Sequence, residues 1–188
     1  ATSAGWSAEL IKQTAECLDY EAYTLGYFES RELIHDLLGQ DAELQKKLVT
    51  LIQTEIKKQL DLQLQSLLKY AVVEEKEDYV LIKVAIDTVK KEREYPPRGK
   101  CTGMLHDALK KKYIKPVLTI GIGTTGFNFR CSTELAGFDV NAVLTFLQEK
   151  LPYAQVDGGG HRVAGSITFI AAASAEVLHS VEEYLKTI

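Results

Sequence analysis

The residues Asp157-Gly158-Gly159-Gly160-His161-Arg162-Val163-Ala164-Gly165 form the most informative stretch of this 188-residue chain. Three successive glycines leave backbone N–H groups unshielded and let the chain reach left-handed conformations. Consecutive N–H groups in a turn form a concave nest that binds anions, and His161 and Arg162 add side-chain donors. We therefore predict a phosphate-binding loop. A flexible connection between a helix and a strand is the alternative that these residues leave open.

The patterns on either side of this stretch predict an α/β domain over residues 70–188. Runs rich in β-branched and aromatic residues indicate strands, and apolar residues at helical spacing indicate helices. The expected strands are Tyr79–Ile86, 116–122, 126–131 and Ala164–Ala172. The expected helices are Cys101–Tyr113, one that Asp139 caps and that runs through Leu147, and one that Ser174 caps. A Gly-Thr-Thr-Gly turn joins the second and third strands as a hairpin. This order predicts a mixed β-sheet flanked by helices, with α+β character.

Residues 1–69 are expected to form a helical segment ahead of that domain. Ser7 is placed as an N-cap before apolar residues at helical spacing. From Asp41 a long helix carries an apolar stripe, formed by Leu44, Leu48, Leu51, Ile52, Ile56, Leu60, Leu64, Leu67 and Leu68. A stripe of this length must pack on the rest of the chain, on a missing domain or on another protein. We therefore divide the chain into a linker or docking segment, residues 1–69, and a domain, residues 70–188.

Basic side chains are concentrated in one part of an otherwise acidic chain. The net charge is −4, yet residues 90–115 contain nine basic and three acidic side chains. Residues 1–89 contain nine basic and sixteen acidic ones. A local basic stretch suits contact with phosphates. The alternative is a solvated helix face, because lysines such as Lys110–Lys112 also suit the C-terminal end of a helix.

The composition favours a protein of the cytoplasm. Apolar residues make up 46% and charged residues 26% of the chain, as in ordinary globular proteins. We see no apolar run long enough for a membrane span and no signal peptide, so we expect no membrane association. Cys17, Cys101 and Cys131 are too widely spaced for a zinc site or a disulfide framework, and we expect buried thiols.

The residues predict no catalytic site and no metal site within this chain. Two-metal phosphoesterases need several carboxylates and histidines that converge on the ions, whereas the aspartates here are scattered. The pairs His35-Asp36 and His106-Asp107 are adjacent on expected helices, where neighbouring side chains point in different directions. Neither a nucleophile elbow nor a Walker loop is found.

The glycine-histidine stretch also carries a resemblance to a known family. Gly-Gly-Gly-His-Arg-Val-Ala-Gly-Ser-Ile, residues 158–167, resembles the G-G-G-H-x-x-A-G segment of the DHH-associated domain of RecJ-like nucleases. Arg130 lies about thirty residues upstream, where that family usually has an arginine that contacts substrate phosphate. Tyr95–Asp107 is similar to the corresponding stretch of archaeal RecJ-like proteins, including the nuclease that associates with GINS. The resemblance covers residues 70–188 and extends more loosely, as a linker, over residues 7–69.

The resemblance implies a set of phosphate-binding residues without catalysis in this chain. The family's DHH domain, whose ligands hold manganese or magnesium, has no counterpart in these residues, so no cofactor is expected here. The matching positions are Gly158, Gly159, Gly160, His161 and Arg130; charge and proximity add Arg162, Arg98 and Lys100. The expected partner is single-stranded nucleic acid, held for a 5′→3′ exonuclease domain.

Two further functions remain open. The chain could be a non-catalytic replisome component that binds GINS or MCM through residues 1–69, in DNA replication or repair. It could also be a fragment of an oligonucleotide or phosphoadenosine-phosphate phosphatase, which would favour mono- and dinucleotides over long strands.

Overall fold

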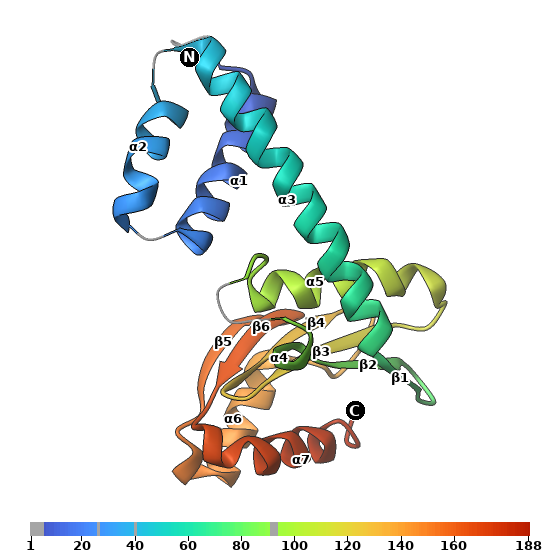
Figure 1. The fold of residues 1–188 in the computed structure, drawn as a ribbon. Coiled ribbons are helices and arrows are strands. Elements are labelled where there is room, and N and C mark those ends of the chain that lie inside the picture. Colours follow the sequence, from blue (N-terminus) through green and yellow to red (C-terminus); the bar gives the residue numbers. More distant parts are fainter. Residues whose placement is uncertain (1–5, 26, 40, 91–93) are drawn as a thin grey trace. The chain divides into compact units, whose positions relative to one another are not determined.

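The computed structural model describes residues 6–25, 27–39, 41–90 and 94–188. They divide into two compact units, one from residues 1–63 with 92–97 and the other from residues 64–91 with 98–188. The order of elements along the chain is α1 (Ala8–Thr24), α2 (Tyr27–Leu37), α3 (Ala42–Tyr70), β1 (Val72–Glu75), β2 (Val80–Ala85), α4 (Ile86–Val89), α5 (Arg98–Leu109), η1 (Lys110–Lys112), β3 (Val117–Gly123), β4 (Gly126–Cys131), α6 (Val140–Lys150), η2 (Pro152–Ala154), β5 (Asp157–His161), β6 (Ala164–Thr168), η3 (Ala171–Ala173) and α7 (Ser174–Tyr184) (Figure 1).

The first unit is helical, as the sequence predicts. The Oγ of Ser7 accepts a hydrogen bond from the Leu10 N–H at 3.1 Å, which confirms Ser7 as the N-cap of α1. The core contains buried Cys17, Leu37, Val49, Ile52, Ile56 and Tyr95. Tyr20 packs edge-on against Tyr95, with ring centroids 5.0 Å apart.

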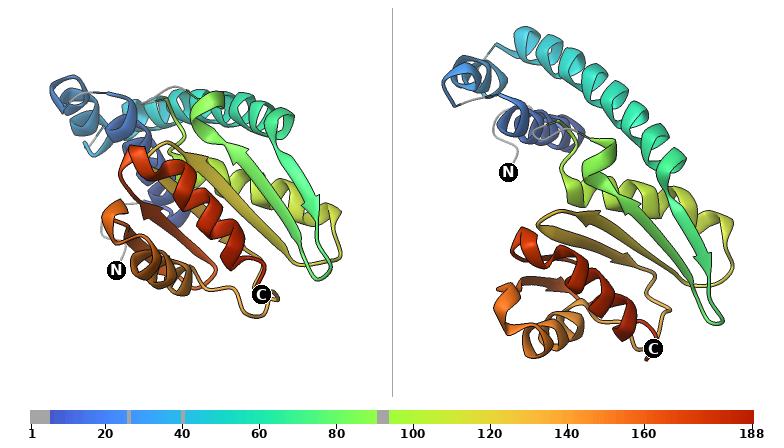
Figure 2. Two further views of the ribbon diagram at one scale, coloured as in Figure 1. Left: turned by 90° about the horizontal axis from the view of Figure 1, so that it is seen from below. Right: turned by 60° about the horizontal axis from the view of Figure 1, so that its bottom comes forward.

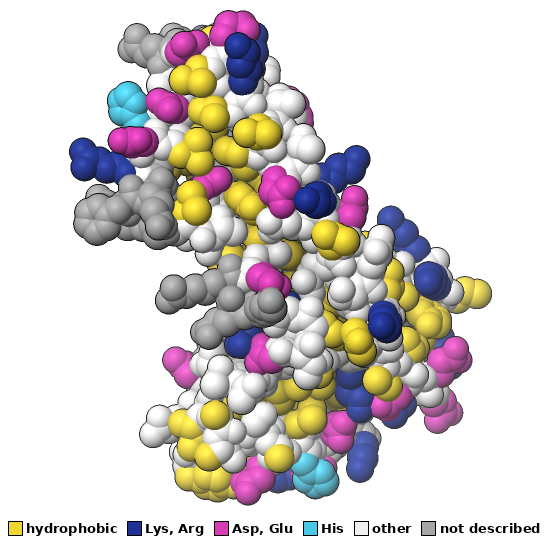
Figure 3. All heavy atoms as spheres, in the orientation of Figure 1, with side chains coloured by type: hydrophobic (Ala, Val, Ile, Leu, Met, Phe, Trp, Pro, Cys, Tyr) yellow, Lys and Arg dark blue, Asp and Glu magenta, His cyan; other side chains and the backbone are white. Residues whose placement is uncertain are grey.

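The predicted apolar stripe of α3 is only partly buried. Ile52 and Ile56 are in the core of the first unit, but Leu44 and Leu51 are 38% and 68% exposed. The apolar positions of this 29-residue helix form a face that is wider than one neighbouring helix covers. Hydrophobic side chains consequently gather on the surface of this unit (Figure 3). The docking role assigned to residues 1–69 stays a prediction.

The second unit is built on a mixed sheet, which confirms the predicted fold class. In the described part of the chain the sheet has six strands in the order β1-β2-β3-β4-β6-β5. β2 and β3 are parallel, and each other neighbouring pair is antiparallel. The β3–β4 hairpin turns at Thr124-Thr125, as the Gly-Thr-Thr-Gly pattern predicts.

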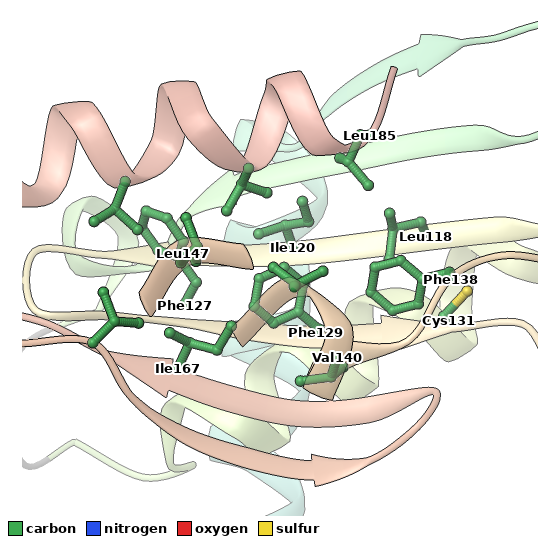
Figure 4. Packing of buried hydrophobic residues seen from close by; sticks show 14 of the residues in the cluster. Leu118, Ile120, Phe127, Phe129, Cys131, Phe138, Val140, Leu147, Ile167 and Leu185 are labelled. Carbon is green, nitrogen blue, oxygen red and sulfur yellow. The ribbon is translucent and has the colours of Figure 1, made fainter. Parts of the chain in front are cut away.

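Helices cover both faces of this sheet (Figure 2). On one face, side chains of β3, β4 and β6 pack with α6 and α7 in a core that includes Leu118, Ile120, Phe127, Phe129, Leu147, Ile167 and Leu185 (Figure 4). On the other face, Cys101 and Leu105 of α5 pack against β2 and β3. The predicted buried thiols are confirmed, because all three cysteines are free and buried.

Several predicted boundaries are wrong. β1 was missed, because its charged four-residue sequence Val-Val-Glu-Glu lacks the alternation of a half-buried strand. Ser174 is the first residue of α7, and the N-cap position is Ala173, which makes no side-chain capping hydrogen bond. The predicted strand Ala164–Ala172 ends at Thr168. Lys91 and Arg93, within the predicted basic stretch, lie outside the described residues.

Candidate nucleic-acid interface

The three glycines of the motif lie on an edge strand, β5, and not in a loop. Their φ angles are +134°, +128° and +151°, in the region that only glycine adopts readily. A Cβ on Gly158 would lie 2.2 Å from the backbone oxygen of Ser166, and one on Gly160 would lie 2.5 Å from that of Ala164. The glycines therefore allow β5 to lie close against β6.

Phosphate binding by these glycines stays a prediction, but they do not form the predicted loop, because β5 pairs antiparallel with β6 along its whole length. In such a pair, the peptide groups of successive residues point alternately toward and away from the partner strand. The N–H and carbonyl of Gly160 both bond to the side chain of Asn141 of α6. The Nδ2 of Asn141 donates to the Gly160 carbonyl at 3.1 Å, and its Oδ1 accepts from the Gly160 N–H at 3.4 Å. Asn141 thus fixes the edge of β5 to α6. No sequence signal singled it out beyond the neighbouring N-cap Asp139, which is confirmed.

The strand register brings Arg130 and His161 into one row. Arg130 of β4 pairs with Ala164 of β6, and Ala164 pairs with His161 of β5. Paired residues point their side chains to the same face of a sheet, and two strand spacings separate the outer two by roughly 10 Å. Ala164 between them is small, His161 is exposed and Arg130 is half-buried. The side chains of Arg130 and His161 can therefore both donate to one anion on this face.

Helix α5 packs along this face beside Arg130. A Cβ on Gly103 would lie 3.6 Å from the Nε of Arg130, and one on Gly99 would lie 3.2 Å from the Oδ1 of Asn128. The N-terminal turn of α5 therefore lies beside Asn128, which sequence reasoning missed. The dipole of a helix N-terminus favours anions. Arg130 itself donates from Nη1 to the Phe129 carbonyl at 3.0 Å.

A buried histidine lies next to this arginine. His106 of α5 is 5% exposed, and its Nδ1 is 3.0 Å from the Oγ1 of Thr119, which pairs with Arg130 across β3 and β4. Burial lowers the pKa of His106 below 6.5, and the charges of Lys110 and Arg130 lower it further, against an opposing effect of Asp107. A neutral His106 leaves the charge of Arg130 available to a ligand.

We predict that acid destabilises the folded protein through His106. The unfolded chain binds a proton near pH 6.5 and the folded chain only at lower pH, so the stability due to neutral His106 is complete above 6.5. It is lost as the pH falls from 6.5 through the folded-state pKa. Urea unfolding at pH 7.5 and 5.0 should show a smaller loss of stability for His106→Asn than for the wild type. An equal loss in both would contradict this assignment.

The other predicted residues are not part of this row. Arg162 is in the β5–β6 turn, and its guanidinium donates to the carbonyls of Phe138 and Thr133, at 3.3 and 3.1 Å. Arg98 at the start of α5 forms an ion pair with Asp87 at 2.8 Å. Lys100 lies in the first turn of α5 and is half-buried. The structure therefore does not bring Arg162 together with Arg130.

The described residues also bear on metal binding, nucleophilic catalysis and membrane spans. Among them, no group of three His, Cys, Asp or Glu side chains is placed to bind a metal ion. Burial raises the pKa of the Cys101 thiol to about 11 and of the Cys131 thiol to about 12, so neither is a nucleophile at neutral pH. None of the helices in the described part of the chain is long and apolar enough to cross a membrane.

Comparison with known proteins identifies relatives of this chain and structures that share its fold. No family model matches the chain. It is 24% identical to the uncharacterized protein MJ1198 of Methanocaldococcus jannaschii over 192 residues, which cover 97% of this chain and 25% of that protein. The chain thus spans about a quarter of the length of this curated relative.

Two solved structures resemble the chain over nearly all of its length. One is described as the DHH domain of a member of a family of ribosomal proteins; it is 30% identical, with a TM-score of 0.80, over 96% of this chain and 43% of that chain. The other is RecJ from Thermus thermophilus in complex with Mg²⁺, which is 16% identical, with a TM-score of 0.59, over 100% of this chain and 28% of that chain. The chain therefore has the fold of a RecJ-like, DHH-associated domain with its preceding helices, and the resemblance predicted from Gly158–His161 is confirmed.

Proposed function

We propose that this chain is the substrate-holding part of a DHH-type phosphoesterase that acts on single-stranded nucleic acid. Arg130 and His161 hold a backbone phosphate on the sheet face, on either side of Ala164, and the N-terminal turn of α5 adds a favourable dipole. The chain supplies no metal ligands in this proposal, and a separate DHH domain supplies the chemistry.

The observation that carries the proposal is the Arg130–Ala164–His161 row. It places two donors from different strands on one face, with a small residue between them. Arginine suits bidentate contact with phosphate, and a contact made to backbone phosphates is tolerant of base sequence. The similarity to RecJ structures supports nucleic acid as the ligand class.

The test is the affinity of the chain for a labelled single-stranded oligonucleotide, measured by fluorescence anisotropy. Arg130→Ala and His161→Ala are each expected to weaken binding by about tenfold, because a hydrogen bond to a charged group contributes about 1.5–3 kcal/mol. Arg130→Ala should also lower the salt dependence by about 0.7 in log–log slope, the value for one phosphate on a single strand. Arg130→Lys should retain charge but lose the bidentate contact.

Matched controls remove a histidine or a positive charge elsewhere on the same unit. His179→Ala on α7 and Lys186→Ala near the C-terminus should leave the affinity unchanged, because α7 packs on the opposite face of the sheet. Unchanged binding by both Arg130→Ala and His161→Ala would overturn the proposal. Competition by a dinucleotide as strong as by a long strand would favour the phosphatase fragment instead.

We propose a non-catalytic replisome component as the second candidate, with residues 1–69 docking onto GINS or MCM. The observation that favours it is the exposure of large leucines on α3, including Leu44, Leu51 and Leu62. Co-purification of the chain with GINS, lost when these leucines are replaced by serine, is the result that supports this candidate. Oligonucleotide binding that depends on Arg130 supports the first.

A further inference from the structure

A cavity lies directly beyond Arg130, where α5 and β4 end. Its volume is about 390 Å³. One wall comes from the connection between α5 and β3, with Lys110, Tyr113 and Lys115, and the other from the residues that follow β4, including Ser132. His106, whose pKa responds to the charge of Arg130, also lines the cavity. The cavity is therefore next to the Arg130–Ala164–His161 row.

The packing of α5 on β4 places this cavity beside Arg130. Gly99 of α5 lies beside Asn128 of β4, and Gly103 lies beside Arg130. Four helix residues rise about 6 Å and two strand residues about 6.6 Å, so the helix and the strand stay in step. The next turn of α5 therefore lies beside Ser132, where the cavity opens. A strand of nucleic acid bound at Arg130 would reach the cavity with its adjoining nucleotide.

The mouth of the cavity is positively charged. Lys110 and Lys115 line it, and Lys111 and Lys112 are exposed beside it. Basic side chains are visible over this end of α5 (Figure 3). Three contacts compete with a ligand: Asp107 pairs with Lys110 at 2.8 Å, the Nζ of Lys115 donates to the Lys76 carbonyl at 2.8 Å, and the Glu134 carboxylate lies in the cavity wall. Exposed pairs of this kind contribute little energy, so a phosphate can displace them.

Apolar surface adjoins these lysines. Ile114 is fully exposed, with a relative exposure of 106%, and Tyr113 beside it is half-buried. A fully exposed isoleucine next to lysines gains free energy when a base or sugar covers it, and tyrosine offers a ring on which a base can stack. A volume of about 390 Å³ lies within the range of small-ligand sites. The lining therefore matches the parts of one nucleotide.

We propose that this cavity is a second nucleotide subsite, which takes the nucleotide adjoining the one held at Arg130. Lys110 and Lys115 hold its phosphate, and Tyr113 and Ile114 contact its base or sugar. The inference rests on the proposed function, since it extends the path of the same strand.

The experiment compares a labelled thymidine mononucleotide with an oligonucleotide of about twelve thymidines by fluorescence anisotropy, at about 50 and 200 mM salt. The double variant Lys110→Ala/Lys115→Ala should bind the mononucleotide within about twofold of the wild type, because a single nucleotide fills only the Arg130 site. With the long oligonucleotide, its log–log salt slope should fall by about 0.7, for one lost phosphate contact on a single strand. Over this salt range the ratio of its dissociation constants is then about 2.6-fold smaller than that of the wild type.

The matched control is Lys111→Ala/Lys112→Ala, which removes the same charge from neighbouring exposed lysines outside the cavity lining. An equal change in slope for both double variants, or no change for Lys110→Ala/Lys115→Ala, would overturn the subsite. Failure of the proposed function is a different result, in which Arg130→Ala leaves the affinity for the mononucleotide unchanged. If the wild type binds neither the mononucleotide nor the oligonucleotide, both proposals are overturned.

Discussion

Gly158→Ala should destabilise the second unit by about 3–5 kcal/mol, which is one of the two largest effects we expect. The new Cβ would lie 2.2 Å from the Ser166 oxygen and 3.0 Å from the Ile167 Cα, both on the backbone of β6. The φ of +134° adds strain for any residue with a Cβ. Because β6 is held between β4 and β5, it cannot move away without loss of ladder hydrogen bonds. Urea unfolding of the purified variant measures the loss.

Gly103→Ala is the matched control for this substitution. Gly103 lies within α5, and its added Cβ would be 3.6 Å from the Arg130 Nε, an ordinary contact. Alanine is favoured over glycine inside a helix, so we expect a gain of about 0.5–1 kcal/mol. A Gly158→Ala variant as stable as the wild type would contradict the close approach of β5 and β6. Oligonucleotide binding should fall with Gly158→Ala, because β5 carries His161.

Phe129→Ala should cost about 3–5 kcal/mol, the second large effect. The Phe129 side chain is fully buried between the sheet and α6, with its ring centroid 6.2 Å from that of Phe138 (Figure 4). Truncation leaves a cavity that the surrounding side chains of β3 and β6 cannot fill without strain. Phe129 alternates with Asn128 and Arg130 along β4, so a loosened core also disturbs the face that carries Arg130.

Chemical denaturation of Phe129→Ala and Phe129→Leu tests this prediction. The leucine variant should lose clearly less stability, because it leaves a smaller cavity. Val73→Ala on β1 serves as the surface control: Val73 is 40% exposed, and we expect a change within about 0.5 kcal/mol. A loss below about 1 kcal/mol for Phe129→Ala would show that the ring is not part of the core.

Local features of the fold could be predicted from the sequence where a few neighbouring residues decide the outcome. Ser7 and Asp139 cap helices with their own side chains, and the Gly-Thr-Thr-Gly turn closes the β3–β4 hairpin. β1 could not be predicted in this way. Its four residues carry little pattern of their own, and they form a strand because Val73 pairs with Ile82 of β2.

The glycine-histidine stretch illustrates the same division within the candidate site. The sequence alone determined that residues 158–160 can adopt positive φ angles, because each of them is a glycine and lacks a Cβ. Only the tertiary structure decided that they form an edge strand, that Arg130 lies in one row with His161, and that Arg162 donates to loop carbonyls instead. Strand register, and with it the sheet face on which a side chain lies, depends on pairing between segments far apart in the chain. A local sequence pattern reflects only interactions between residues close together in the sequence.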